Sequence, residues 1–137
     1  MMAANSTTKP KVYVSTLWCF HLHQCCQYFF EDVDEVDFTN LLNLRCGANS
    51  IVIRSKEKYR FCYFLNVLVK ERRFVNAIRD FWITEILKAT SITDNYYKSH
   101  YGDPLREDFK ELKANKEIVR ELAEAIDKAR GRILNHT

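Results

Sequence analysis

One stretch decides the fold that this sequence predicts: residues 51–87, IVIRSKEKYRFCYFLNVLVKERRFVNAIRDFWITEIL. Between Tyr59 and Val67, apolar side chains occupy every second position, which is the period of a β-strand with one buried face. Between Phe74 and Ile86, apolar side chains recur every four residues, as they do along one face of an α-helix. The stretch therefore predicts a strand that runs directly into a helix.

The predicted strand has a candidate partner immediately before it. Ser50–Arg54 is rich in β-branched residues, and the polar residues 55–58 separate it from the alternating segment Tyr59–Val69. Two such segments joined by a short polar turn are typical of an antiparallel β-hairpin. We expect this hairpin to be followed by a long helix over Lys70–Lys88.

The region before the hairpin leaves two interpretations open. Even-numbered positions from Val12 to Leu22 are mostly apolar, which favours a half-buried strand. The second interpretation is a strand over residues 11–16 and then a helix whose N-cap is Ser15 or Thr16. The buried face of that helix would consist of four residues: Trp18, Leu22, Cys25 and Phe29.

Helices are also expected on both sides of the central stretch. Val36–Cys46 has an apolar side and is followed by Gly47, a typical C-cap residue. Thr90–Asn95 is expected to be a short strand or a loop, and Asp103-Pro104 is a strong helix start. The last helix carries an apolar stripe: Ile118, Leu122, Ile126 and Ile133.

The order of these elements predicts an α+β fold. A strand, a helix, a hairpin and a further helix form a small antiparallel sheet with helices on one face, the ferredoxin-like βαββα arrangement. We expect a disordered N-terminus over residues 1–10 and a core domain over residues 11–102. Residues 103–137 would form a C-terminal helical segment that packs on this core or extends from it.

Composition is that of one ordered domain inside the cell. The chain has 137 residues, 47% of them hydrophobic, which is enough for a substantial core. The five cysteines show no spacing typical of a disulfide framework, and the N-terminus lacks the layout of a signal peptide. No apolar run has the length of a membrane span. We therefore expect reduced thiols and a cytoplasmic or nuclear location.

Charge is unevenly distributed along the chain and suggests a nucleic-acid ligand. The net charge is only +3, but an acidic block at residues 31–37 precedes a basic central region. Lysine and arginine near the hairpin turn and at the start of the following helix could neutralise phosphates, and tyrosine or phenylalanine on an open sheet could stack on bases. The predicted DNA- or RNA-binding residues are Arg45, Arg54, Lys56, Lys58, Arg60, Lys70, Arg72 and Arg73.

Protein interaction is the alternative function. An open sheet face or an amphipathic helix can hold a protein partner or a second copy of the chain through apolar contacts. The residues expected to contact such a partner are those of the C-terminal stripe: Ile118, Leu122, Ile126 and Ile133.

An enzymatic function has only weak support in the sequence. The densest set of metal-ligand types is Cys19, His21, His23 and Cys26, but no second pair of ligands completes a usual zinc site. His21-Leu22-His23 resembles the His-hydrophobic-His pair of rolling-circle replication nucleases, which also need a nucleophilic tyrosine, commonly with lysine three residues later. No tyrosine here has lysine at that spacing. We expect no cofactor and a non-enzymatic protein, with a metal-dependent nuclease as the minor alternative.

Four short segments resemble a family of viral DNA-binding domains. Leu42-Asn43-Leu44-Arg45, Gly47-Ala48, Cys62-Tyr63-Phe64 and Ala77-Ile78-Arg79-Asp80 are locally similar to origin-binding domains of the Epstein-Barr nuclear antigen 1 type. This resemblance implies a viral, dimeric domain that holds DNA with the helix around residues 39–45.

Overall fold

The fold is entirely helical in the part of the chain that the structure, a computed structural model, describes: residues 12–101 and 113–134. The expected α+β fold with a ferredoxin-like sheet is therefore wrong. The single β pairing among these residues is an isolated antiparallel bridge between Phe30 and Ile53. The elements are α2 (Thr16–Cys26), the 3-10 helix η1 (Gln27–Phe29), α3 (Glu35–Leu42), the 3-10 helix η2 (Ser55–Glu57), α4 (Lys58–Arg72), α5 (Asn76–Thr90), α6 (Asp94–His100) and α7 (Lys113–Leu134).

The segment Tyr59–Val69, predicted to be a strand, lies in α4. Its most deeply buried side chains, each at most 1% exposed, have helical spacing: Phe61, Cys62, Phe64, Leu65 and Leu68. Tyr63 and Val67 are only partly buried and pack at the edge of the core. A helix that is apolar around most of its circumference contains apolar residues at almost every spacing, including two, so the alternation was misleading.

The other predicted strand, Ser50–Arg54, is an extended connection rather than half of a hairpin. Ile51 and Ile53 are buried, and Val52 between them is exposed, so the alternation is real. Its partner is the segment around Phe30: the Glu31 amide donates to the Val52 carbonyl at 3.1 Å.

The helix predicted over Lys70–Lys88 is interrupted. Arg73 has φ 53 and closes α4 in the left-handed conformation, and α5 begins three residues later, at Asn76. A helix does cover residues 76–90, so the expectation holds beyond the break. Thr90–Asn95 contains the αL cap Ser91, with φ 59, and the first residues of α6.

The N-terminal region follows the second of its two interpretations. Ser15 is the N-cap of α2, where its hydroxyl accepts from the Trp18 amide at 3.4 Å. The helix expected over Val36–Cys46 ends earlier, at Leu42 with Asn43 as its C-cap, so Gly47 plays no capping role.

Aromatic rings form the centre of the core. Neighbouring ring centroids in this cluster lie between 5.6 and 6.3 Å apart, within the usual range for aromatic pairs. The cluster joins η1 and the residue after it to α3 and α4 through five side chains: Phe29, Phe30, Phe38, Phe61 and Phe64.

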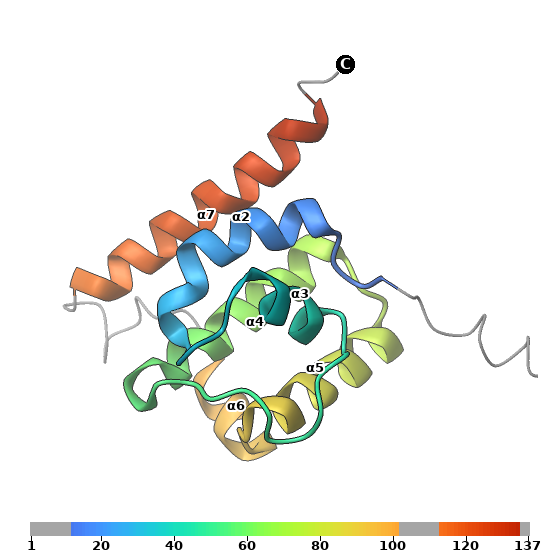
Figure 1. Cartoon of the computed structure of the whole chain (residues 1–137), viewed down its shortest axis with the longest axis vertical. Coiled ribbons are helices and arrows are strands. Elements are labelled where there is room, and N and C mark those ends of the chain that lie inside the picture. Colours follow the sequence, from blue (N-terminus) through green and yellow to red (C-terminus); the bar gives the residue numbers. More distant parts are fainter. Residues whose placement is uncertain (1–11, 102–112, 135–137) are drawn as a thin grey trace, which may run out of the picture.

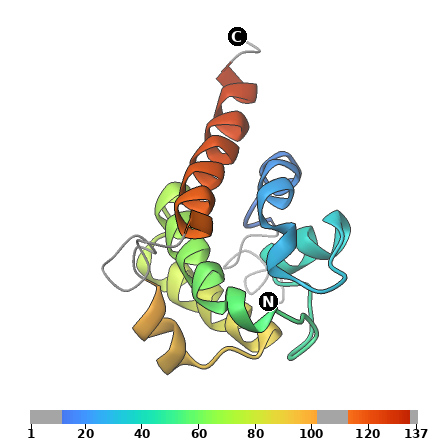
Figure 2. The same cartoon turned by 90° about the vertical axis from the view of Figure 1, so that its left-hand side faces the viewer.

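Figure 1 shows α7 alongside α2, and α7 also contacts α4. Figure 2 shows that the C-terminal end of α7 runs past the rest of the molecule. The apolar stripe of α7 is buried at Ile118, Leu122 and Ile126. None of the described helices is both long and apolar enough to cross a membrane. The helix start predicted at Asp103-Pro104 lies outside the described residues.

Candidate interaction groove between helices α4, α5 and α6

The predicted nucleic-acid-binding residues do not form one patch. Arg54 and Lys56 lie at η2, and Lys58 is the first residue of α4, whereas Lys70 lies in the last turn of the same helix. At a rise of 1.5 Å per residue, Lys58 and Lys70 are about 18 Å apart along the helix axis. The cations near α4 thus form two separate groups.

Two of these arginines are held by contacts inside the molecule. Arg60 is buried, and its Nη1 donates to Glu57 Oε1 at 2.7 Å. The Arg72 guanidinium lies over the Trp18 ring, 5.2 Å from its centroid. Arg45, which follows α3, and Arg73, which follows α4, remain exposed at the surface. The basic run in the sequence therefore overstates the cationic surface.

The candidate metal ligands belong to the core or its edge. Cys19, His21 and Cys26 are buried in α2, and a His23 ring nitrogen lies 3.1 Å from the Val33 carbonyl oxygen. Burial raises the pKa of Cys19 to about 11 and also raises that of Cys26, so both thiols stay protonated at neutral pH. The described residues contain no group of three His, Cys, Asp or Glu side chains placed to hold a metal ion.

The apolar stripe predicted to bind a partner is occupied within the molecule. Ile118, Leu122 and Ile126 are at most 4% exposed, and their helix packs on α2. The side chain of Ile133 lies outside the part of the chain that the structure describes. At Ile118, Leu122 and Ile126 the stripe is part of the core rather than a free surface.

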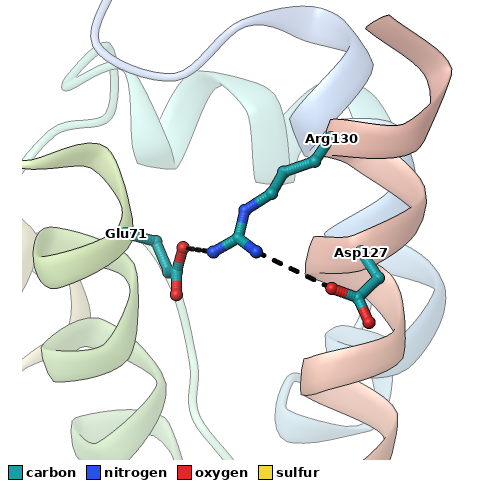
Figure 3. A network of polar contacts seen from close by, with 3 residues as sticks. All are labelled: Glu71, Asp127 and Arg130. Atoms are coloured by element: carbon teal, nitrogen blue, oxygen red, sulfur yellow. Dashed lines mark hydrogen bonds and ion pairs between the residues drawn. The ribbon is translucent and has the colours of Figure 1, made fainter. Parts of the chain in front are cut away.

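A small hollow remains between α4 and α7. It has a volume of about 180 Å³, and Tyr63, Val67 and Ile126 contribute apolar surface to it. Figure 3 shows the polar network at its edge: Arg130 of α7 pairs with Glu71 of α4, and its other guanidinium nitrogen lies 3.7 Å from Asp127. The hollow has room for one side chain of a partner and not for a longer segment.

A much larger open groove lies between α4, α5 and α6, which we call the interaction groove. Its volume is about 1010 Å³. Three buried side chains form its apolar floor, one from each helix: Val69 of α4, Ile83 of α5 and Tyr97 of α6. Packing of α6 on α4 brings these helices together.

Charges of both signs line the rim of the interaction groove. Arg79 Nη2 lies 3.1 Å from Asp80 Oδ1, and Lys98 Nζ lies 2.9 Å from Asp94 Oδ2. Lys70 also lines the groove, and it forms no ion pair within residues 12–101 and 113–134. Exposed ion pairs are worth at most about 1 kcal/mol, so a partner can displace them readily.

Hydrogen-bonding and aromatic groups complete the lining. Asn66 and Thr84 supply polar side chains, and Tyr101 is 44% exposed. The ring of Tyr101 meets that of Tyr97 edge-on, with centroids 5.2 Å apart. Burial raises the pKa of Tyr97, and the charge of Arg79 opposes part of that rise, so the Tyr97 hydroxyl remains a neutral donor.

Sequence reasoning found only part of this groove. Lys70 was among the predicted binding residues, whereas Arg79, Lys98 and the floor were not. The lining residues of α4, such as Asn66, share a helix face only once residues 59–69 are recognised as helical. The third side of the groove is formed by α6, whose position depends on tertiary packing and leaves no local signal in the sequence.

Comparisons with known proteins found no match to this chain among protein-family models, curated proteins or solved structures. The resemblance to viral origin-binding domains therefore stays a prediction.

Proposed function

We propose that this chain is a protein-interaction module that binds a segment of a protein partner in the interaction groove. The observation that carries the proposal is the composition of the groove, which has an apolar floor and a rim of opposite charges. Protein interfaces commonly combine an apolar centre that is closed to water with a polar, solvent-accessible rim. A volume of about 1010 Å³ leaves room for several side chains of a bound segment.

Nucleic acid is the second candidate, and Lys70 and Arg73 favour it because both are exposed near the end of α4. Phosphates would meet Asp80 and Asp94 in the same groove, and these carboxylates repel them. A peptide can offer charges of both signs, so it matches the rim better than a polyanion does.

Selection of peptides from a random displayed library tests the proposal. Peptides enriched on the unmodified chain should bind at least tenfold more weakly to Thr84→Trp, because the exposed Thr84 lines the groove and an indole there occupies it. Gln24→Trp is the matched control, since Gln24 is exposed on α2, which contributes no residue to the groove. Peptides that bind both variants equally well would contradict the proposal.

A titration with labelled DNA and RNA at low and physiological salt separates the second candidate. Salt-sensitive binding that Lys70→Glu abolishes would favour nucleic acid over a peptide ligand. Absence of binding at both salt concentrations would remove the second candidate.

A further inference from the structure

The walls of the interaction groove are helix faces. The lining residues Asn66, Val69 and Lys70 are three and four positions apart, so they share one face of α4. Those of α6 have the same spacing, from its first residue, Asp94, to its C-cap, Tyr101. Main-chain amides and carbonyls inside a helix bond to each other. The walls therefore offer a ligand mainly side chains.

The end of α6 at the groove is closed in the same way. The Tyr101 amide donates to the Tyr97 carbonyl at 2.9 Å, and the Tyr101 carbonyl accepts from Asn66 Nδ2 of α4 at 3.4 Å. An extended peptide binds by pairing with a row of free main-chain donors and acceptors. The described residues of the groove present no such row. A segment that covers the apolar floor must therefore satisfy its main chain internally.

Charge on the rim limits the partner further. Five charged side chains line the groove, and four of them form the pairs Arg79–Asp80 and Lys98–Asp94. The fifth, Lys70, forms no ion pair within the residues that the structure describes. A partner with many charges of one sign would be repelled by one member of each rim pair, whereas a single carboxylate can meet Lys70.

We propose that the partner segment is an amphipathic α-helix, an inference that rests on the proposed function. A helix satisfies its own main chain, and its apolar stripe covers the apolar floor. The lining of α6 extends from Asp94 to Tyr101, about 10.5 Å along the helix axis, so the contact spans about two turns of the bound helix. Apolar anchors at positions i, i+3 or i+4, and i+7 match this length. One carboxylate beside the stripe pairs with Lys70.

Substitution scans of the peptides selected on the full chain test this inference. Alanine should weaken binding at least about tenfold at the anchors, which should be three or four positions apart. At positions where alanine is tolerated, glycine should weaken binding about fivefold, because it disfavours the helix without changing a contact with the groove. Proline at an interior position should weaken binding about a hundredfold.

A matched pair of protein variants tests the charge. Lys70→Gln should weaken peptide binding about threefold at low salt and less at high salt. Lys116→Gln should leave binding unchanged, because Lys116 is exposed on α7 and does not line the groove. Circular dichroism spectra establish that both variants are folded. Equal binding to Lys70→Gln and to the unmodified chain would overturn the assignment of the carboxylate.

Failure of this inference is distinguishable from failure of the proposed function. Peptides that bind Thr84→Trp more weakly but tolerate an interior proline, or whose anchors alternate with a period of two, would overturn the helix and leave the groove as the binding site. A library that yields no peptide sensitive to Thr84→Trp would contradict the proposed function itself.

Discussion

Asn43 joins the N-terminal segment to α3 through a set of buried hydrogen bonds, and its removal should be unusually costly. Asn43 is buried, with only 5% of its surface exposed. The oxygen Oδ1 accepts from the amides of Tyr13 and Val14, at 2.6 and 3.0 Å. The nitrogen Nδ2 donates to the carbonyls of Val14 and Thr39, at 2.9 Å in each case.

Asn43→Ala removes all four of these bonds. It leaves the amides of Tyr13 and Val14 without an acceptor, whereas the Thr39 carbonyl keeps the Asn43 amide and the Val14 carbonyl keeps the Cys19 thiol. At a net value of about 1 kcal/mol for each bond, the free energy of unfolding should fall by about 4 kcal/mol. Domains of this size have about 5 to 15 kcal/mol in total, so the variant should be only marginally stable.

Urea denaturation followed by circular dichroism measures this loss. With a slope of about 2 kcal/mol per molar urea, the midpoint should fall by about 2 M. Asn95→Ala is the control, because Asn95 is exposed on α6, and its effect should stay within about 0.5 kcal/mol. Hydrogen exchange adds a local measurement, since the amides of Tyr13 and Val14 should lose protection. A loss below about 1 kcal/mol would refute the reasoning and would mean that water replaces the side chain.

Three further predictions concern the core, the attachment of α7 and the buried thiols. Trp82→Phe should cost about 2 kcal/mol in urea denaturation, because the indole Nε1 donates at 2.7 Å to a buried main-chain carbonyl at the end of α3; an unchanged midpoint would contradict this. Leu122→Ala should lower the free energy of unfolding by about 2 to 5 kcal/mol, because it removes a buried side chain of α7. Arg130→Met should lower it by at most about 1 kcal/mol, because the exposed ion pair with α4 contributes little. Equal losses for the two variants in urea denaturation would contradict this prediction. Burial raises the pKa of Cys19 to about 11 and that of Cys62 to about 12. Above pH 9 these thiols are therefore ionised in the unfolded chain but still protonated in the folded one, so unfolding releases protons. The free energy of unfolding should therefore fall as the pH rises from 9 to 11, by about 2 kcal/mol for Cys19. Alanine at both positions should reduce this slope in denaturation curves recorded at pH 7.5, 9 and 10.5; an unchanged slope would argue against the role of the thiols.

Local signals in the sequence were reliable where side chains act on their own backbone. Ser15 was recognised as an N-cap candidate because its hydroxyl can accept from an amide three residues later, and it does so in α2. The end of α3 was misplaced because Gly47 matched a general preference, whereas the actual C-cap is Asn43. Three of the four side-chain hydrogen bonds of Asn43 reach Tyr13 and Val14, about 30 positions earlier in the chain and beyond the reach of any local rule.

The strand predicted over Tyr59–Val69 failed for a different physical reason. Period-two alternation identifies a strand only when the positions between the apolar ones are polar, and Phe64 and Leu68 are both apolar and buried. A central helix that packs on several neighbours has no wide polar face to reveal its period. The aromatic content that favoured a strand instead supplies the ring cluster of the core.

The break at Arg73 decides whether the interaction groove exists at all. In an uninterrupted helix over Lys70–Lys88, Lys70 and Arg79 would lie about 14 Å apart along the axis and on opposite faces, because nine residues at 100° each end half a turn away. No glycine marks the break, since Arg73 itself adopts the left-handed conformation with φ 53. The interruption redirects α5 so that both cations line one groove. A glycine at position 73 should therefore preserve the groove, whereas a β-branched residue, which tolerates positive φ poorly, should weaken this corner and peptide binding together.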